Sequence, residues 1–305
     1  MFFVYMNYLQ TITFRLVVIF LLCSTVGFSQ SITRKEVEGK ITSLIRSSHS
    51  DVGVAVLDLD SGEKMGFNNK KHYPMQSVFK FHLGLAVLKK IDEGVLSLDQ
   101  IVDVKKEKLD TNTWSPMIKE YPNQDLHVSI KDLLRYTVEQ SDNNACDILF
   151  ELVGGPAKVN AYIHSTGVQD IKISATEGEM KKAWSVQFTN WSTPTAAVQL
   201  LEKFYKGNLL KKAQHDFLWE LLVHSIRSER LQTALPKDAV VGHKSGTSGR
   251  NAQGVRAAFN DIGIVNLSNG KHFAIALFVS DSKESDEATI QLMKDITKVV
   301  WEYYK

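Results

Sequence analysis

The stretch SVFKFHLGLAVL, residues 77–88, predicts a helix with apolar side chains on nearly every side. Such a helix is buried inside a protein rather than laid on its surface. Ser77 and Lys80 are three residues apart, so they share one face of this helix. A serine hydroxyl becomes a good nucleophile when a base removes its proton, and a lysine in apolar surroundings can be that base. Taken alone, the spacing also fits a helix-capping serine and a surface lysine.

The segments on either side of this helix predict strands near both ends of the chain and helices between them. β-Branched and apolar runs predict strands at residues 51–60, 240–244, 258–267 and 272–280. Helical patterns cover residues 36–46, 77–91, 130–139, 143–153, 194–204 and 287–304, whereas residues 168–190 have no period and predict a long ordered loop. The order predicts an α/β (α+β) fold with one antiparallel sheet built from both termini. We expect an α/β lobe from residues 30–76 and 222–305, an inserted all-α lobe from residues 77–221, and a ligand cleft between them.

The composition is that of an ordinary globular protein, with 44% hydrophobic and 23% charged residues in a chain of 305. A formal charge of +2 gives no strong field for nucleic acid or an anionic membrane surface. Residues 1–29 contain a single charge, Arg15, and an apolar run shorter than the ~20 residues that cross a bilayer. This predicts a cleavable signal peptide, a periplasmic protein and no membrane attachment after cleavage. Because Cys23 leaves with that segment, Cys146 is expected to have no disulfide partner.

Two further motifs carry polar groups suited to catalysis. Ser141-Asp-Asn143 lies between two predicted helices, where it can cap a helix or supply a proton-relaying hydroxyl and a carbonyl-binding amide. Lys244-Ser-Gly-Thr247 ends a predicted strand. A glycine there lets a ligand approach the backbone, and the lysine offers a fixed cation to an anionic substrate. Each motif alone also has a plain structural interpretation, as a helix cap or as a strand running into a turn.

Together the three motifs resemble the set Ser-x-x-Lys, Ser-Asp-Asn and Lys-Thr-Gly of class A (serine) β-lactamases and penicillin-binding proteins. Here the third motif is Lys-Ser-Gly. The resemblance runs from about residue 36 to the C-terminus, and Gln76, Asp147 and Thr247-Ser-Gly249 are similar to the PER- and VEB-like extended-spectrum branch. It implies a β-lactamase/transpeptidase-like fold, a monomer, no metal and no cofactor. The implied activity is hydrolysis of the β-lactam amide bond of penicillins and cephalosporins, which confers antibiotic resistance.

The resemblance also implies a role for each matching residue. Ser77 is the nucleophile, and its backbone N–H would form an oxyanion hole with that of Thr247. Lys80 would accept or relay the proton, and Ser141 would pass one to the leaving ring nitrogen. The implied substrate-binding residues are Asn143 for the side-chain amide, Lys244, Ser245, Thr247 and Arg230 for the carboxylate, and Trp114 at the cleft rim.

Hydrolysis needs a second base that activates water against the acyl-enzyme. The long loop contains Glu177 at the place where the family has this base, and Glu179 is the competing candidate. Many family members have an asparagine four residues after the glutamate, whereas this chain has Lys181. The sequence leaves open whether Lys181 points away or another group positions the water. A penicillin-binding D-Ala-D-Ala peptidase or transpeptidase and a non-hydrolytic β-lactam sensor are the alternatives, and Glu177 favours the hydrolase.

Overall fold

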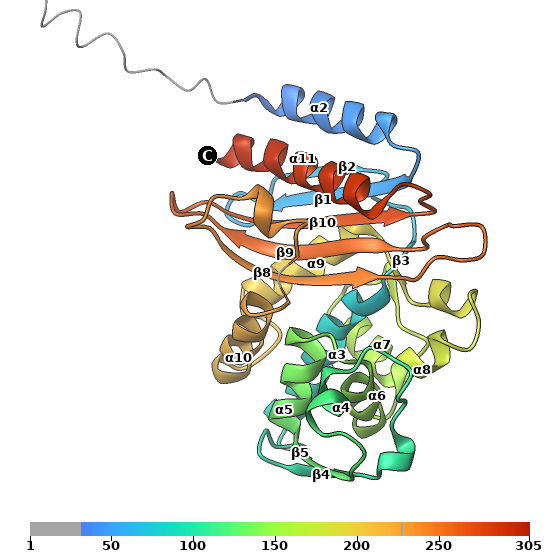
Figure 1. The fold of residues 1–305 in the computed structure, drawn as a ribbon. Coiled ribbons are helices and arrows are strands. Elements are labelled where there is room, and N and C mark those ends of the chain that lie inside the picture. Colours follow the sequence, from blue (N-terminus) through green and yellow to red (C-terminus); the bar gives the residue numbers. More distant parts are fainter. Residues whose placement is uncertain (1–31, 227) are drawn as a thin grey trace, which may run out of the picture.

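The computed structural model describes residues 32–226 and 228–305 (Figure 1). The predicted signal peptide and Cys23 lie outside the described residues. An antiparallel sheet has the strand order β2-β1-β10-β9-β8. Its strands are β1 (Asp51–Asp58), β2 (Lys64–Phe67), β8 (Val240–Thr247), β9 (Phe259–Asn266) and β10 (His272–Ser280). The sheet is thus assembled from both ends of the chain, which confirms the predicted mixed fold.

Helices α2 (Arg34–Ser47) and α11 (Asp286–Tyr304) cover one face of the sheet (Figure 1). Thr33 and Glu36 form a capping box that fixes the start of α2. Side chains alternate between the faces of a strand, so β1 and β10 supply one apolar set to this layer and a second set to the opposite face. The set on this face joins the two helices in one buried cluster of Val37, Ile41, Val54, Phe273, Ile275, Met293 and Val300, among others.

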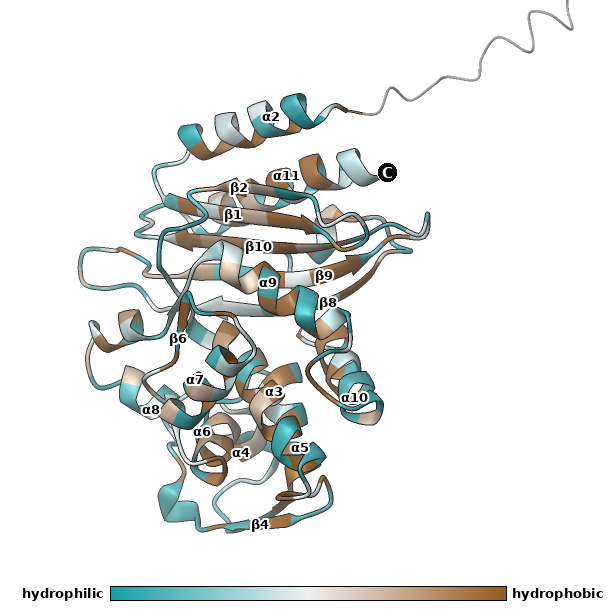
Figure 2. Ribbon diagram, turned by 180° about the vertical axis from the view of Figure 1, so that it is seen from behind, coloured by the Kyte–Doolittle hydropathy of each residue, from teal (hydrophilic) through white to brown (hydrophobic). Residues whose placement is uncertain are grey.

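The opposite face of the sheet carries α9 (Pro194–Tyr205), which crosses β10 and β9 in Figure 2, while α10 (Lys212–Val223) packs beside β8. Leu57, Phe278 and Phe204 are among the buried residues of this layer. The remaining helices lie below it: α3 (Phe79–Asp92), α4 (Pro116–Glu120), α5 (Ile130–Leu134), α6 (Asn143–Leu152), α7 (Pro156–Ser165) and α8 (Glu177–Met180). Short strands complete this part: β3 (Tyr73–Pro74), β4 (Ile101–Val104), β5 (Leu126–Ser129), β6 (Ile171–Lys172) and β7 (Trp191–Ser192).

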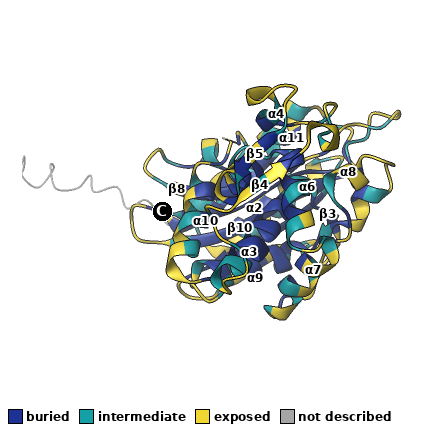
Figure 3. Ribbon diagram, turned by 90° about the horizontal axis from the view of Figure 1, so that it is seen from below, coloured by how far each residue is buried: buried dark blue, intermediate teal, exposed yellow. Residues whose placement is uncertain are grey.

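Helix α3 is the buried helix that the opening stretch predicts. Its first ten residues, Phe79 to Leu88, are all buried, and Figure 3 colours buried residues dark blue. The predicted start at Ser77 is wrong by two residues, because Gln76–Val78 forms a 3₁₀ turn before α3. The first residue of this turn, Gln76, has a left-handed backbone with φ of 48°. The predicted helix over residues 130–139 is likewise divided, since α5 passes into a π-helical turn at Arg135–Glu139.

The predicted loop over residues 168–190 contains short helices and a short strand, which the sequence did not predict. It includes β6, the single turn of α8 and a 3₁₀ helix at Val186–Thr189. None of these is long enough to show a period in the sequence. Within the described ranges, no helix has the length and apolar character needed to cross a bilayer.

Candidate active site

Ser77 lies in the turn before α3, beside the edge strand β8. The Gln76 side chain donates from Nε2 to Gln187 Oε1 at 2.6 Å, which ties the turn to the long loop. On the strand side, a Cβ added to Gly246 would lie 2.4 Å from the Met75 carbonyl oxygen and 3.1 Å from the Ser77 nitrogen. Glycine is therefore the residue that lets β8 pass this close to the Gln76–Val78 turn.

Lys80 is completely buried one turn after Ser77. Its Nζ donates to the Ser141 carbonyl oxygen at 2.7 Å and to Asn143 Oδ1 at 2.5 Å. It also lies 2.9 Å from Glu177 Oε1. A buried ammonium is tolerated when oxygen partners replace its water shell, and these three oxygens do so.

Glu177 stands at the first position of α8, with Oε1 3.4 Å from Ser77 Oγ. The Asp147 carboxylate of α6 accepts from the backbone N–H of Glu177 and of Gly178, each at 2.8 Å. Burial raises the pKa of Asp147 to about 6, and the two N–H donors and Lys80 act in the opposite direction. This carboxylate fixes the backbone of α8 so that the Glu177 side chain reaches both Ser77 and Lys80.

Asn190 binds the backbone of the segment that leads into α8. Its Oδ1 accepts from the backbone N–H of Ser174 at 2.7 Å and of Ala175 at 3.0 Å, and its Nδ2 donates to the Ala175 carbonyl at 2.8 Å. The side chain is fully buried. Sequence reasoning missed this residue, because one asparagine in an aperiodic loop gives no signal of its partners.

Ser141 has a left-handed backbone, with φ of 59°, and its hydroxyl accepts from Lys244 Nζ at 3.0 Å. The helix-capping role belongs to its neighbour Asp142, whose Oδ1 accepts from the Ala145 N–H at 2.8 Å. Lys244 is buried, and this burial, together with the nearby Lys80 charge, lowers the pKa of Lys244 to about 7. Ser141 thus contacts Lys80 of α3 through its carbonyl and Lys244 of β8 through its hydroxyl.

Arg230 brings a second cation to the end of β8. Its guanidinium lies 3.6 Å from the centre of the Phe259 ring and donates to the Asn260 carbonyl and Thr247 Oγ1, each at 2.5 Å. Burial lowers the pKa of Arg230 to about 10, which leaves it cationic at neutral pH. Ser245 pairs with Asp261 of β9, on the same strand as Lys244 and Thr247.

Two residues form the rim opposite β8. The Asn143 Nδ2 donates to Thr113 Oγ1 at 2.8 Å, and its backbone N–H donates to the Trp114 carbonyl at 3.0 Å. The Trp114 indole is 52% exposed and donates to the Gln140 carbonyl at 3.0 Å. An exposed ring fixed in this way offers a flat apolar surface at the mouth of the site.

The remaining candidates, Lys181 and Glu179, bind groups other than Ser77, and His243 beside Lys244 is likewise engaged elsewhere. The Lys181 Nζ lies 2.6 Å from Asp110 Oδ2 and 2.6 Å from the Asn112 carbonyl. Glu179 accepts from the Thr176 N–H at 2.8 Å as part of a capping box. His243 is buried against Asp261, with Nδ1 2.9 Å from Oδ1. Among residues 32–305, leaving out 227, no group of three or more His, Cys, Asp or Glu side chains is arranged to hold a metal ion.

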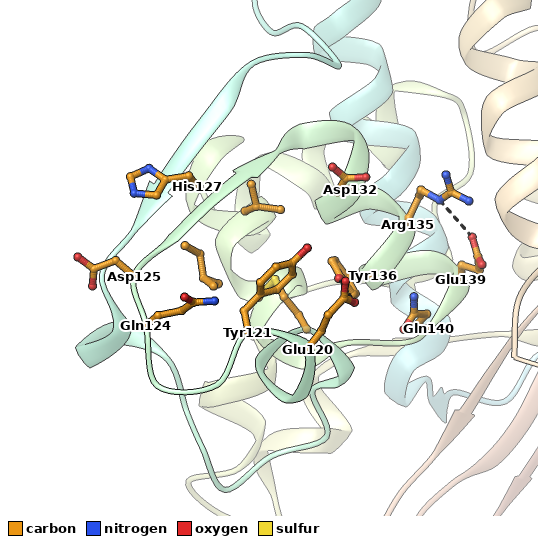
Figure 4. A pocket seen from close by; sticks show the side chains of 13 residues that line it. Glu120, Tyr121, Gln124, Asp125, His127, Asp132, Arg135, Tyr136, Glu139 and Gln140 are labelled. Carbon is orange, nitrogen blue, oxygen red and sulfur yellow. Dashed lines mark hydrogen bonds and ion pairs between the residues drawn. The ribbon is translucent and has the colours of Figure 1, made fainter.

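A separate hollow lies in the helical part, and Figure 4 shows its polar lining. Arg135 Nε and Glu139 Oε2 lie 3.7 Å apart within it, and Tyr136 donates to Glu120 at 2.5 Å. Neither Ser77 nor any charged residue around it contributes to this lining.

Comparison with known proteins covers almost the whole described chain. The model of the β-lactamase enzyme family matches residues 36–304. Beta-lactamase VEB-1 of Pseudomonas aeruginosa is 41% identical over 268 residues, 87% of this chain and 89% of that protein. Extended-spectrum beta-lactamase PER-1 of the same species is 38% identical over 284 residues, 93% of this chain and 92% of that protein. The crystal structure of TLA-3 extended-spectrum beta-lactamase superposes with a TM-score of 0.87 at 48% identity, covering 89% of this chain and 99% of that one.

Proposed function

Because the chain belongs to the β-lactamase enzyme family and is a class A enzyme that hydrolyses β-lactams, we propose that Ser77 and Glu177 carry the two halves of this reaction. The observation that carries the proposal is the Glu177 carboxylate, 3.4 Å from Ser77 Oγ and 2.9 Å from Lys80 Nζ. A nucleophile and a base within reach of each other, with a third group orienting the base, is the arrangement that activates a hydroxyl.

The first half of the reaction forms an acyl-enzyme. Ser77 Oγ attacks the ring carbonyl while the Lys80–Glu177 pair takes its proton. The tetrahedral oxyanion is stabilised by the backbone N–H groups of Ser77 and Thr247. The ring C–N bond then breaks, and Ser141 gives its hydroxyl proton to the leaving nitrogen. The proton held by the Lys80–Glu177 pair passes through Lys80 to Ser141, so Glu177 is again a carboxylate. The Lys244 ammonium holds that hydroxyl in place at 3.0 Å.

The second half releases the product. Glu177 removes a proton from a water molecule, which attacks the ester carbon of the acyl-enzyme. The bond from this carbon to Ser77 Oγ then breaks, and Glu177 returns the proton to Ser77 Oγ. Asp147 supports this step by fixing the α8 backbone at Glu177 and Gly178. The Lys181 ammonium is bound to Asp110, so it does not occupy the place of that water molecule.

Substrate binding is assigned to the charged and aromatic rims of the site. Lys244 and Arg230 attract the ring carboxylate, together with the hydroxyl groups of Ser245 and Thr247. The Asn143 amide holds the substrate's side-chain amide, and Trp114 packs against the adjoining substituent. PER-1 and TLA-3 carry the name extended-spectrum, and we propose a spectrum of penicillins and cephalosporins that includes oxyimino cephalosporins for this chain as well.

Intact-protein mass spectrometry after addition of a cephalosporin tests the assignment. We expect no adduct with Ser77→Ala, and a long-lived adduct with Glu177→Gln whose hydrolysis is about 10²–10⁴-fold slower than in the wild type. Rapid turnover by Glu177→Gln would falsify the assigned base. A stable adduct on the wild-type protein would instead favour a peptidase or a sensor.

We further propose that the mature protein is a periplasmic monomer, exported by cleavage after Ser29. The molecular mass of the protein recovered from a periplasmic extract, compared with that of the full chain, tests both the cleavage and the periplasmic location. Size-exclusion chromatography coupled to light scattering gives the oligomeric state.

A further inference from the structure

Lys181 is placed where its charge can reach the catalytic base. Its backbone N–H donates to the Glu177 carbonyl at 3.2 Å, so the two residues stand four apart on one helical turn. Side chains at this spacing lie on the same face of a helix, with Cβ atoms about 5–6 Å apart. A lysine side chain is long and flexible, and opposite charges at this spacing attract each other. An unrestrained Lys181 ammonium therefore has the Glu177 carboxylate within reach.

In the structure the Lys181 ammonium is bound elsewhere. Two oxygens of the facing loop, Asp110 Oδ2 and the Asn112 carbonyl, accept from it at 2.6 Å each. Among the ion pairs formed by residues 32–226 and 228–305, Glu177 takes part in the one with Lys80 alone. Asp110 and Asn112 thus keep the Lys181 ammonium away from the Glu177 carboxylate.

Asp110 is built to hold this cation. Its backbone N–H donates to Asn144 Oδ1 at 2.9 Å, and its carbonyl accepts from Asn144 Nδ2 at 3.0 Å. These two bonds anchor it to α6, the helix that also carries Asp147. The Asn112 N–H donates to Asp110 Oδ1 at 2.8 Å, which leaves Oδ2 turned toward Lys181. The hydrogen bond from Lys181 and that from Asn112 lower the pKa of Asp110, so its carboxylate is charged at neutral pH.

We propose that Asp110 is a positioning residue for acyl-enzyme hydrolysis, because its carboxylate holds the Lys181 ammonium away from Glu177. A second ammonium on Glu177 would stabilise the anion and occupy an oxygen that must accept the proton of water. The inference rests on the proposed role of Glu177. It gives Asp110 an effect on deacylation although Asp110 does not touch Ser77.

A double-mutant cycle tests this arrangement. Acyl-enzyme hydrolysis is measured by intact-protein mass spectrometry and kcat for Asp110→Asn, Lys181→Met and the double variant. We expect deacylation to slow about tenfold in Asp110→Asn, with adduct accumulating, because the released ammonium then weakens the base. Lys181→Met should stay within about twofold of the wild type, and the double variant should recover to the same level, because neither retains the interfering charge.

The controls separate charge placement from support of the loop. Asp125→Asn removes another exposed pair of the same kind, with Lys105 at 2.6 Å, and should leave deacylation unchanged. Asp110→Glu keeps the carboxylate and should behave like the wild type. Equal losses in both single variants without recovery in the double variant would overturn the inference, as would an unaffected Asp110→Asn. Glu177→Gln is measured in parallel: if it stalls while Asp110→Asn does not, this inference fails and the proposed function stands.

Discussion

The two sides of Ser77 are built by different means. On the strand side, Lys244, Gly246 and Thr247 take their places from the backbone register of β8 against β9. On the loop side, Glu177 takes its place from side chains that bind backbone groups, namely Asp147 and Asn190. A strand supplies geometry through many backbone hydrogen bonds, whereas a loop with few regular backbone hydrogen bonds depends on a few polar side chains. The strand side should therefore be sensitive to added volume, and the loop side to the loss of single polar groups.

Adding one methyl group to Gly246 should have the largest effect. The new Cβ would lie 2.4 Å from the Met75 carbonyl oxygen, so β8 must move away from the nucleophile turn. Overpacking of this kind costs about 1–3 kcal/mol, and each 1.4 kcal/mol is a factor of ten in rate. We expect kcat/KM to fall about 100-fold for every β-lactam tested.

The matched control is Gly249→Ala, because a Cβ at that glycine meets no atom within 4 Å. It should keep nearly all its activity. If Gly246→Ala retained more than half of the wild-type kcat/KM, activity would not depend on the close approach of β8 to the turn that carries Ser77.

Removing the Asn190 side chain should affect the loop side alone. Asn190→Ala leaves the N–H and the carbonyl of the buried Ala175 without their partner, which costs about 1–3 kcal/mol for each unsatisfied group, whereas Ser174 is exposed and its N–H can bind water. We expect deacylation to slow about 10- to 50-fold while acylation of Ser77 continues, so that adduct accumulates. Urea unfolding should show a stability loss of about 2–6 kcal/mol, from the two backbone groups of Ala175.

Asn208→Ala, at an exposed loop position, serves as the control for Asn190→Ala and should change neither rate. Equal losses of acylation and deacylation in Asn190→Ala would mean that the two sides are not separable.

The same contrast explains what the sequence could predict. Recognisable motifs in or beside periodic elements supply Ser77, Lys80, Ser141 and Lys244. In the structure, Lys80 and Lys244 both bind Ser141, and Lys80 also pairs with Glu177. The strands that carry the sheet were predictable because β-branched runs have a clear pattern. The loop carried one usable signal, Glu177, which came from the family resemblance rather than from the period of the residues.

The contacts that hold the loop could not be predicted, because they join residues far apart in the chain. Asn190 binds backbone groups 15 and 16 residues away, and Asp147 binds those 30 and 31 residues away. Nothing in the local pattern links such pairs. The orientation of Lys181, left open by the sequence, is decided by Asp110, which lies 71 residues earlier.

The smallest expected effects come from changes of pH. The acidic change should arise on the loop side, from Asp147, and the alkaline change on the strand side, from Lys244. Burial raises the pKa of Asp147 to about 6, so below that pH the neutral group is a poorer acceptor for two N–H donors and kcat should fall through the deacylation step. Burial and Lys80 lower the pKa of Lys244 to about 7, so above that pH the cation is lost and KM for a ring carboxylate should rise. Profiles of kcat and kcat/KM from about pH 5 to 9 should show a few-fold change on each limb.

Two variants test which residue causes each limb of these pH profiles. Lys244→Arg keeps its charge at high pH and should flatten the alkaline limb of kcat/KM, whereas Asp147→Asn should flatten the acidic limb of kcat. A guanidinium is bulkier than an ammonium, so the diagnostic quantity is the shape of the profile and not its height. If kcat and kcat/KM instead shared both limbs, one titrating cluster would govern the whole site. The strand and the loop would then act on Ser77 as a single electrostatic unit, despite being built from different kinds of contact.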